Sequence, residues 1–183
     1  MSRIYTRQGD DGTTGRYLGG RVSKADLLVE ASGDVDETVA LLGVARASTA
    51  DAATAELLLR LQRELFVVGA DLAANPTHRD RLAAEVSRVT PRMVATLEAL
   101  IDRLVAERPL RPVFVVPGAT PAGAALDHAR TVARRAERHV VAAGDAGGAV
   151  SMEVLAYLNR LSDLLFVLAR HAAGEAEEPA SRA

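Results

Sequence analysis

The chain has 183 residues, a formal net charge of −2 at pH 7 and no cysteine, so it fits one domain and excludes disulfides, thiolate nucleophiles and cysteine-ligated metals. Aromatic residues make up 3% and hydrophobic residues 49% of the sequence, which favours packed helices with an aliphatic, alanine-rich core over a β-sandwich. The charge balance argues against a general nucleic-acid binder, and without a membrane-length apolar run or a secretory signal we expect a cytoplasmic protein that does not contact membranes.

Residues 1–24 are rich in glycine and threonine, which predicts an arm of loops and turns rather than a helix. Hydrophobic residues then recur at steps of three and four, and this spacing predicts helices. The five expected ranges are about 25–48, 52–72, 91–107, 121–144 and 151–173, with Gly144 capping the fourth. Residues 113–116 are expected to be extended, and the polar residues 175–183 to form a flexible tail. The sequence therefore predicts an all-α five-helix bundle over residues 25–174, preceded by a glycine-rich arm.

Polar side chains share a face on each of the last two predicted helices. Arg130, Arg134 and Glu137 lie at positions i, i+4 and i+7 of the fourth helix. They suit either a solvated, salt-bridged surface or an anion site, because arginine side chains match phosphate oxygens. Asn159 and Asp163 begin a polar line on the fifth helix. That line suits either an interhelical hydrogen-bond row or a contact to a nucleotide.

The glycines of residues 6–15 are three apart, with hydroxyl and charged side chains between them. Such a loop is either a phosphate-binding nest of backbone amides or a structural arm, and it matches neither a Walker P-loop nor a dinucleotide fingerprint. Asp36 and Glu37 point about 100° apart on a helix and cannot form an acid–base dyad. One of them can pair with an arginine while the other faces solvent. The histidines have no metal-ligand spacing.

Six segments, taken together, resemble one family. They are residues 3–14 (RIYTRQGDDGTT), 21–24 (RVSK), 35–37 (VDE), 117–118 (PG), 129–138 (ARTVARRAER) and 157–166 (YLNRLSDLLF). In this order they are similar to the signatures of the PduO-type ATP:cobalamin adenosyltransferases. The chain departs from the family pattern at Arg7, where many members carry lysine, at Val39, where asparagine is expected, and at Ala119, which replaces a glycine.

The resemblance implies a homotrimer of five-helix bundles with active sites between subunits. The arm of one subunit and the fourth and fifth helices of another would bind ATP. The ATP-binding residues implied are Thr6, Arg7, Gly9, Asp10, Gly12, Thr13, Lys24, Arg130, Arg134, Glu137 and Asn159. The catalytic residues implied are Arg130, Arg134 and Asp36, with Asp36 pairing with Arg130 across the interface. Phe114 would form a wall at the lower face of the corrin ring.

The implied reaction transfers the 5′-deoxyadenosyl group of ATP to the cobalt of cob(I)alamin and releases triphosphate. No direct metal motif is present, so Mg²⁺ would arrive with ATP and Glu137 would be the residue able to reach it. A corrinoid reductase and an adenosylcobalamin-dependent enzyme are the implied protein partners. The alternative function is an ATP-binding carrier or sensor of corrinoid without turnover.

Overall fold

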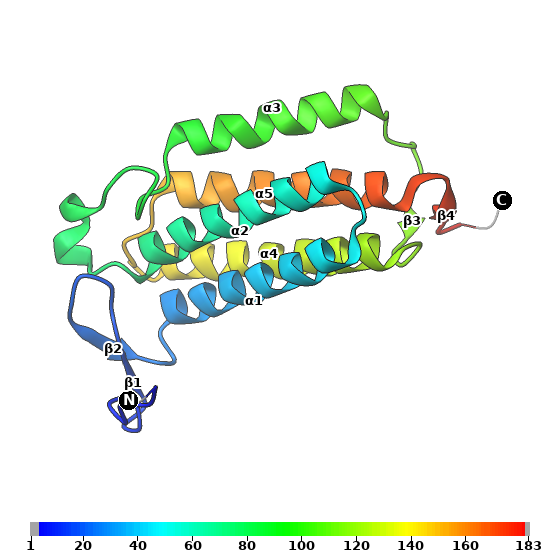
Figure 1. Cartoon of the computed structure of the whole chain (residues 1–183). Coiled ribbons are helices and arrows are strands. Elements are labelled where there is room, and N and C mark those ends of the chain that lie inside the picture. The colour runs from blue at the N-terminus through cyan, green and yellow to red at the C-terminus, as the bar shows by residue number, and fades with distance from the viewer. Residues whose placement is uncertain (1–3, 182–183) are drawn as a thin grey trace.

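The computed structural model describes residues 4–181, and five long helices make up most of it (Figure 1). These helices are α1 (Leu27–Ser48), α2 (Ala52–Ala73), α3 (Pro91–Glu107), α4 (Pro121–Asp145) and α5 (Met152–Ala173). A short 3₁₀ helix, η1 (Pro76–Arg81), connects α2 to α3. The predicted all-α five-helix bundle is confirmed. The fourth helix continues past Gly144, the expected cap, and Ala146 caps it instead through its backbone N–H.

Each long helix begins at a residue whose side chain satisfies an unpaired backbone N–H of the first turn. These residues are Asp26, Asp51, Thr90, Thr120 and Ser151. Proline follows Thr90 and Thr120, where its missing N–H costs nothing and its fixed φ suits a helix. These caps define where the helices start, which explains why the sequence predicts those boundaries well.

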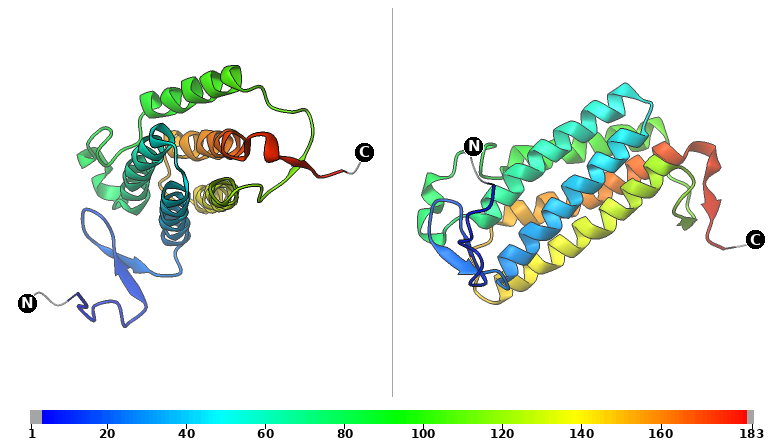
Figure 2. Two further views of the ribbon diagram at one scale, coloured as in Figure 1. Left: turned by 45° about the vertical axis from the view of Figure 1, so that its right-hand side comes forward. Right: turned by 60° about the horizontal axis from the view of Figure 1, so that its bottom comes forward.

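The bundle packs α1 along α4 and α4 along α5, while α3 lies outermost and packs on α5 (Figure 2). Leucines from α1, α2 and α5 fill the core, including Leu42, Leu61 and Leu165, all fully buried. A stripe of small residues on α4 is buried as well. It comprises Ala125, Ala129, Val132, Ala133, Ala136, Val140 and Ala143. Small side chains there let α4 lie close to both neighbours. None of the helices within residues 4–181 has the length and hydropathy that crossing a membrane requires.

The arm contains a β-hairpin that the sequence did not predict. Strand β1 (Thr13–Gly15) pairs antiparallel with β2 (Arg21–Ser23). Gly19 and Gly20 form the turn with φ angles of 93° and 87°, a conformation that side chains rarely adopt. Three-residue strands give too short an alternation to be recognised in a sequence. The hydrophobic pattern of the sequence therefore does not predict the hairpin.

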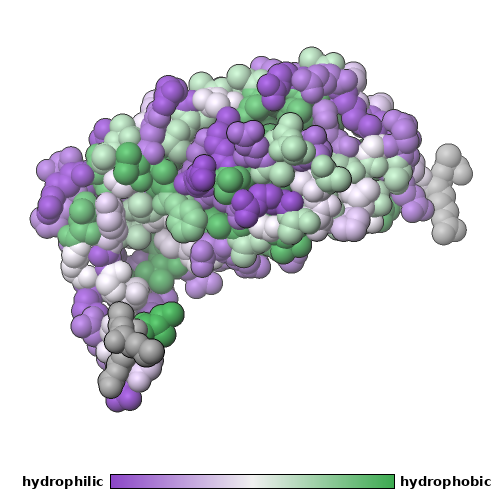
Figure 3. Space-filling view, viewed as in Figure 1, coloured by the Kyte–Doolittle hydropathy of each residue, from purple (hydrophilic) through white to green (hydrophobic). Residues whose placement is uncertain are grey.

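Contacts near Tyr17 attach this hairpin to the end of α2. The Tyr17 N–H donates to the Ala73 carbonyl at 2.9 Å, and the Asn75 N–H donates to the Tyr17 carbonyl at 2.8 Å. The Asn75 side chain also donates to the Gly19 carbonyl. The rest of the arm projects from the bundle as a separate lobe, at the lower left of Figure 3.

The segment after Gly174 differs from the expected flexible tail. It forms a 3₁₀ turn, η2 (Gly174–Ala176), and then β4 (Glu178–Pro179), which pairs with β3 (Val115–Val116). The side chain of Glu177 is only 4% exposed and lies beside Arg170. The polar composition did not predict this docking, because the docking depends on the buried ion pair between Glu177 and Arg170. Residues 1–3 and 182–183, the ends of the expected arm and tail, lie outside the described residues.

Candidate functional site

A groove between α4 and α5 brings together three of the residues singled out in the sequence. It has a volume of about 320 Å³ and is lined by Arg134, Glu137, Arg138, Val141 and Asn159. The Asn159 side-chain Nδ2 donates to Glu137 Oε1 at 3.0 Å. The structure thus joins the polar faces of the two helices. Asn159 makes an interhelical hydrogen bond, as one interpretation of the polar line predicts. It also lines the groove, as the nucleotide-binding interpretation requires.

Arg134 and its neighbour Arg135 have opposite environments. The Arg135 guanidinium donates to Asp34 Oδ1 at 2.8 Å and also pairs with Glu37. Its hydrogen bond to Asp34 is the main cause that raises the pKa of Arg135. The exposed Arg134 guanidinium makes no ion pair or side-chain hydrogen bond within residues 4–181. Arg134 therefore keeps an uncompensated positive charge at the groove, which suits an anionic ligand.

The adjacent acidic residues Asp36 and Glu37 of α1 have different environments, as neighbouring positions on a helix predict. Glu37 pairs with Arg135, while Asp36 is exposed and has no ion pair within the described residues. Asp34 was not among the predicted site residues, yet it is buried and its Oδ2 lies 2.7 Å from His139 Nδ1. A signal was present, since Asp34 shares the buried face of α1 with Ala31. An acid among core positions needs a partner.

Arg130 lies on α4 but does not line the groove. Its side chain is 29% exposed, and its Nε is 3.7 Å from Asp127 Oδ1. Its terminal nitrogens make no hydrogen bond within residues 4–181. Arg130 and Asp36 form no ion pair with each other within the described chain, and the pairing implied by the family resemblance would join two subunits.

Lys24 closes the glycine-rich loop of the arm. Its Nζ donates to the Gly9 carbonyl at 2.8 Å, and its backbone N–H donates to the Gly12 carbonyl at 2.9 Å. The Thr13 hydroxyl and N–H both donate to Asp11, which lowers the pKa of that exposed carboxyl. The lysine charge is thus held against the loop. Thr6, Arg7 and Asp10 are exposed on the same loop.

Phe114 is presented at the opposite end of the molecule from the arm. Its residue is 90% exposed, directly before β3 and near the start of α4. The Ala180 N–H donates to the Phe114 carbonyl at 2.8 Å, beside the β3–β4 ladder. A large apolar side chain held out in this way suits contact with an apolar partner.

The singled-out residues form separate groups within one chain. Figure 1 places the arm at one end of the bundle and β3, next to Phe114, at the other, with α4 running between them. The arm residues, the groove residues and Phe114 therefore do not converge on one pocket in a single copy.

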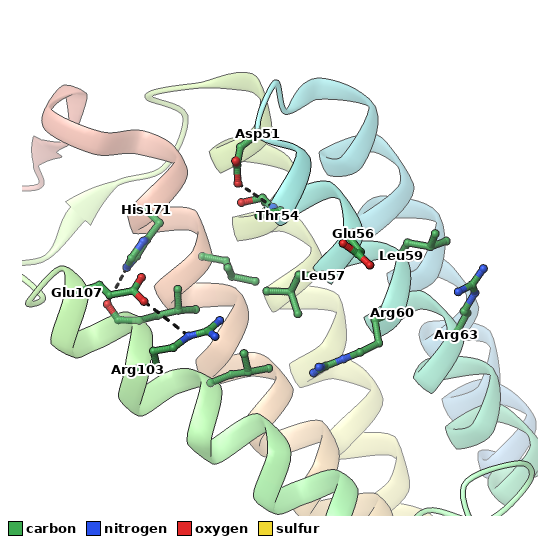
Figure 4. Close-up of a pocket in the computed structure, with 14 residues that line it drawn as sticks. Asp51, Thr54, Glu56, Leu57, Leu59, Arg60, Arg63, Arg103, Glu107 and His171 are labelled. Atoms are coloured by element: carbon green, nitrogen blue, oxygen red, sulfur yellow. Dashed lines mark hydrogen bonds and ion pairs between the residues drawn. The ribbon is translucent and has the colours of Figure 1, made fainter.

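A second hollow, of about 720 Å³, lies between α2, α3 and α5 and contains none of the predicted site residues (Figure 4). Its charges largely compensate each other. Arg103 pairs with Glu107, and Arg60 lies 3.2 Å from Glu64. No group of three or more histidines or carboxylates within residues 4–181 could hold a metal ion. The chemistry of this hollow therefore points to no particular ligand.

Comparison with known proteins supports the resemblance seen in the sequence. The family model described as cobalamin adenosyltransferase matches residues 4–172. A corrinoid adenosyltransferase from Citrobacter freundii is 44% identical over 93% of this chain and 94% of its own length. One from Mycobacterium leprae is also 44% identical, over 93% of this chain and 91% of its own length.

A solved structure with the same fold comes from Lactobacillus reuteri. It is a variant PduO-type ATP:corrinoid adenosyltransferase complexed with cobalamin and ATP. It is 32% identical to this chain, superimposes with a TM-score of 0.84, and the match covers 97% of this chain and 95% of that one. Sequence and fold agree over nearly the whole length, and the chain therefore belongs to the cobalamin adenosyltransferase family.

Proposed function

We propose that this corrinoid adenosyltransferase binds ATP between the arm of one copy and the α4–α5 groove of another, and there transfers the 5′-deoxyadenosyl group to a reduced corrinoid. The observation that carries the proposal is the uncompensated guanidinium of Arg134 beside the Glu137–Asn159 pair. The separation of arm and groove within one chain supports a site shared between copies. Asp36, which is exposed and has no ion pair in the described part of the chain, is the proposed partner of Arg130 in the second copy.

The reaction asks the protein to stabilise a leaving group rather than to supply a nucleophile. Reduced cobalt attacks the 5′-carbon of ATP, the carbon–oxygen bond breaks, and triphosphate departs with the negative charge. Lys24, Arg130 and Arg134 are the cations proposed to stabilise that charge. This assignment needs no serine, cysteine or histidine nucleophile. Asn159, with Glu137 as its partner, is proposed to orient the nucleoside.

The donor set suits Mg²⁺ that arrives with ATP better than a resident ion. Mg²⁺ commonly binds one or two carboxylates together with substrate phosphates and water. Glu137 is the one carboxylate lining the groove, and one of its oxygens already accepts from Asn159. Glu137 would hold the ion, whose chemistry is to neutralise phosphate charge. The protein side chains then fix where the phosphates lie.

Phe114 is the proposed contact of the chain with the corrin ring. An apolar ring at the lower face of the corrinoid would keep a donor ligand away from cobalt, which favours the more reduced metal. The reduced substrate requires a corrinoid reductase, and the product serves an adenosylcobalamin-dependent enzyme, so both are proposed partners.

Mixing two inactive variants tests the shared site. Lys24→Ala removes the arm's cation and Arg134→Ala the groove's cation, so each homotrimer should lose most activity while keeping its size and melting curve. In a cyclic trimer formed from an equimolar mixture, about a quarter of the sites combine an intact arm with an intact groove. The co-expressed mixture should therefore recover about that fraction of wild-type turnover with Mg-ATP and chemically reduced cobalamin. Arg103→Ala, which changes an exposed arginine of the other hollow, is the control and should stay fully active.

Two outcomes would contradict the proposal. If the mixed trimers gain no activity over the separate variants, the arm and the groove do not share a site across copies. If Arg134→Ala turns over normally, the groove is not where the triphosphate binds.

A further inference from the structure

Asp127 lies at the centre of a buried row of alternating charges that the catalytic assignments above do not use. Arg170 of α5 and Glu177 of the docked C-terminal segment continue the row on one side, and Arg130 of α4 ends it on the other. The side chains of Arg170, Asp127 and Glu177 are only 7%, 5% and 4% exposed. Charged groups are rarely buried without partners, so this row needs an explanation.

Close contacts link each member to the next. Arg170 Nη2 donates to Asp127 Oδ2. Arg170 Nε lies 3.1 Å from Glu177 Oε1, and Arg130 Nε lies 3.7 Å from Asp127 Oδ1. Neither of the last two contacts is a hydrogen bond, because the first is not aligned and the second is too long, although Arg170 Nε, Glu177 Oε1 and Arg130 Nε are all shielded from water. They are therefore charge–charge contacts, which act strongly where water is excluded.

The row contacts the Arg130 guanidinium on its Nε side only. Asp127 and Arg130 are three positions apart on α4, so their side chains lie on the same helix face. Asp127 approaches the Nε side of the guanidinium, and the two terminal nitrogens make no hydrogen bond within residues 4–181. Those nitrogens carry the geometry that matches phosphate or carboxylate oxygens.

We propose that Asp127 is a positioning residue, which holds the Arg130 guanidinium by its inner edge so that its terminal nitrogens face the triphosphate. Arg170 and Glu177 in turn hold Asp127 in place. The inference rests on the proposed role of Arg130 in binding phosphate. A long arginine side chain loses rotamer freedom when it binds, and a fixed carboxylate removes part of that freedom before ATP arrives.

The arrangement also gives the C-terminal segment a role at the ATP side of the site. Glu177 belongs to the segment that pairs with β3 through Glu178–Pro179. Its carboxylate is a second counter-charge for the Arg170 guanidinium, in addition to that of Asp127. Docking of this segment thus completes the shell that fixes Asp127.

Asp127→Asn is the main test, because it removes the charge but keeps the volume and a hydrogen-bond acceptor for Arg170. Arg170 retains Glu177 as its counter-charge, so the full-length protein should fold. We expect the KM for ATP to rise about fivefold through lost preorganisation, with an unchanged KM for the corrinoid. The dissociation constant of ATP, measured by calorimetry without corrinoid, should rise by a similar factor.

A double-mutant cycle separates positioning from a general structural effect. If Asp127 acts through Arg130, Asp127→Asn should weaken ATP binding in the wild-type background and have no further effect in an Arg130→Ala background. Tyr157→Phe is the control for stability, since it removes a buried hydrogen bond to Glu64 on the same bundle without touching Arg130. Its ATP affinity should equal that of the wild type even when its melting temperature is lowered.

Three results would overturn the proposal. An equal loss from Asp127→Asn with and without Arg130 would mean that the effect does not pass through the arginine. Normal ATP affinity in Asp127→Asn, together with weakened binding in Arg130→Ala, would keep the phosphate role of Arg130 but remove the positioning role of Asp127. Normal ATP affinity in Arg130→Ala would remove the phosphate role itself, and the positioning proposal with it.

Discussion

The side-chain amide of Asn159 is fixed from both sides. Its nitrogen donates to Glu137 across the two helices at 3.0 Å, and its oxygen accepts from Arg160 at 2.5 Å. Arg160 is itself held by Glu98 at 2.9 Å. The donor of the amide therefore faces the acidic residue of the groove, and no rotation of the amide satisfies both neighbours equally well. This fixed polarity makes Asn159 a sensitive position for nucleotide binding.

Asn159→Asp should raise the KM for ATP about tenfold, because it replaces a donor by a second carboxylate next to Glu137 and brings a negative charge toward the triphosphate. Steady-state kinetics with reduced cobalamin measures the change. The loss should be smaller at low pH, where the pair of carboxyls can share a proton. Asp163→Asn, one turn along α5 and exposed, is the control and should leave the KM unchanged. A normal ATP dependence in Asn159→Asp would exclude the nucleoside role.

Phe114→Ala should lower turnover and raise the KM for the corrinoid, with little change in stability or in the KM for ATP. The residue is 90% exposed, so its removal costs almost no burial. Phe66→Ala provides a matched control, because Phe66 on α2 is also exposed, at 65%, and has no proposed role. Parallel titrations of ATP and corrinoid with both variants make the comparison. Equal corrinoid kinetics in the two variants would remove Phe114 from the site.

The fold was predictable because its signals are local. Thr90-Pro91 and Thr120-Pro121 mark helix starts through their own side chains and ring geometry, and the leucine spacing defines the buried faces. The family signatures then indicated the reaction. None of these signals depends on contacts between distant residues.

The details that the sequence did not predict depend on long-range partners. Asp34 and Asp36 are two positions apart, yet one is buried against Arg135 and His139 while the other faces solvent. The helix spacing places Asp34 among core positions, but only the position of α4 beside α1 identifies Arg135 and His139 as its partners. The docking of Glu177 likewise depends on Arg170, and nothing in the sequence near Arg170 shows that it is buried beside a carboxylate.

Alkaline pH should destabilise the protein through Tyr157. Burial, followed by the charge of Glu64 and the hydrogen bond to it, raises the pKa of Tyr157 well above its usual value. Above about pH 10 the tyrosine of the unfolded chain loses its proton while the folded protein keeps it. The unfolded state then binds fewer protons than the folded state, so the free energy of unfolding falls as the pH rises. Its slope approaches about 1.4 kcal/mol per pH unit.

Urea unfolding at about pH 9 and about pH 11 measures this slope. Tyr157→Phe should reduce it, because phenylalanine does not titrate. Tyr17→Phe changes an exposed tyrosine and should keep the wild-type slope. The same pH dependence in all three proteins would show that the buried phenol is not responsible.

Arg170→Met should be strongly destabilising, whereas Arg160→Met on the same helix should not. Arg170 is 7% exposed and neutralises two buried carboxylates, Asp127 and Glu177. Removing one partner of a buried ion pair typically costs about 3–5 kcal/mol, because a charge is left without compensation. Arg160 is 39% exposed and pairs with a half-exposed Glu98, and such surface pairs contribute at most about 1 kcal/mol.

Equilibrium urea unfolding of both variants at neutral pH gives the two free-energy changes. The triple variant that combines Arg170→Met with Asp127→Leu and Glu177→Gln should recover much of the loss, because no buried charge then lacks a partner. If Arg170→Met alone lowers the free energy of unfolding only slightly, water reaches the two carboxylates. The C-terminal segment would then not exclude water from the row of charges. Recovery in the triple variant together with weakened ATP binding would separate the two effects, since the carboxylate beside Arg130 would still be missing.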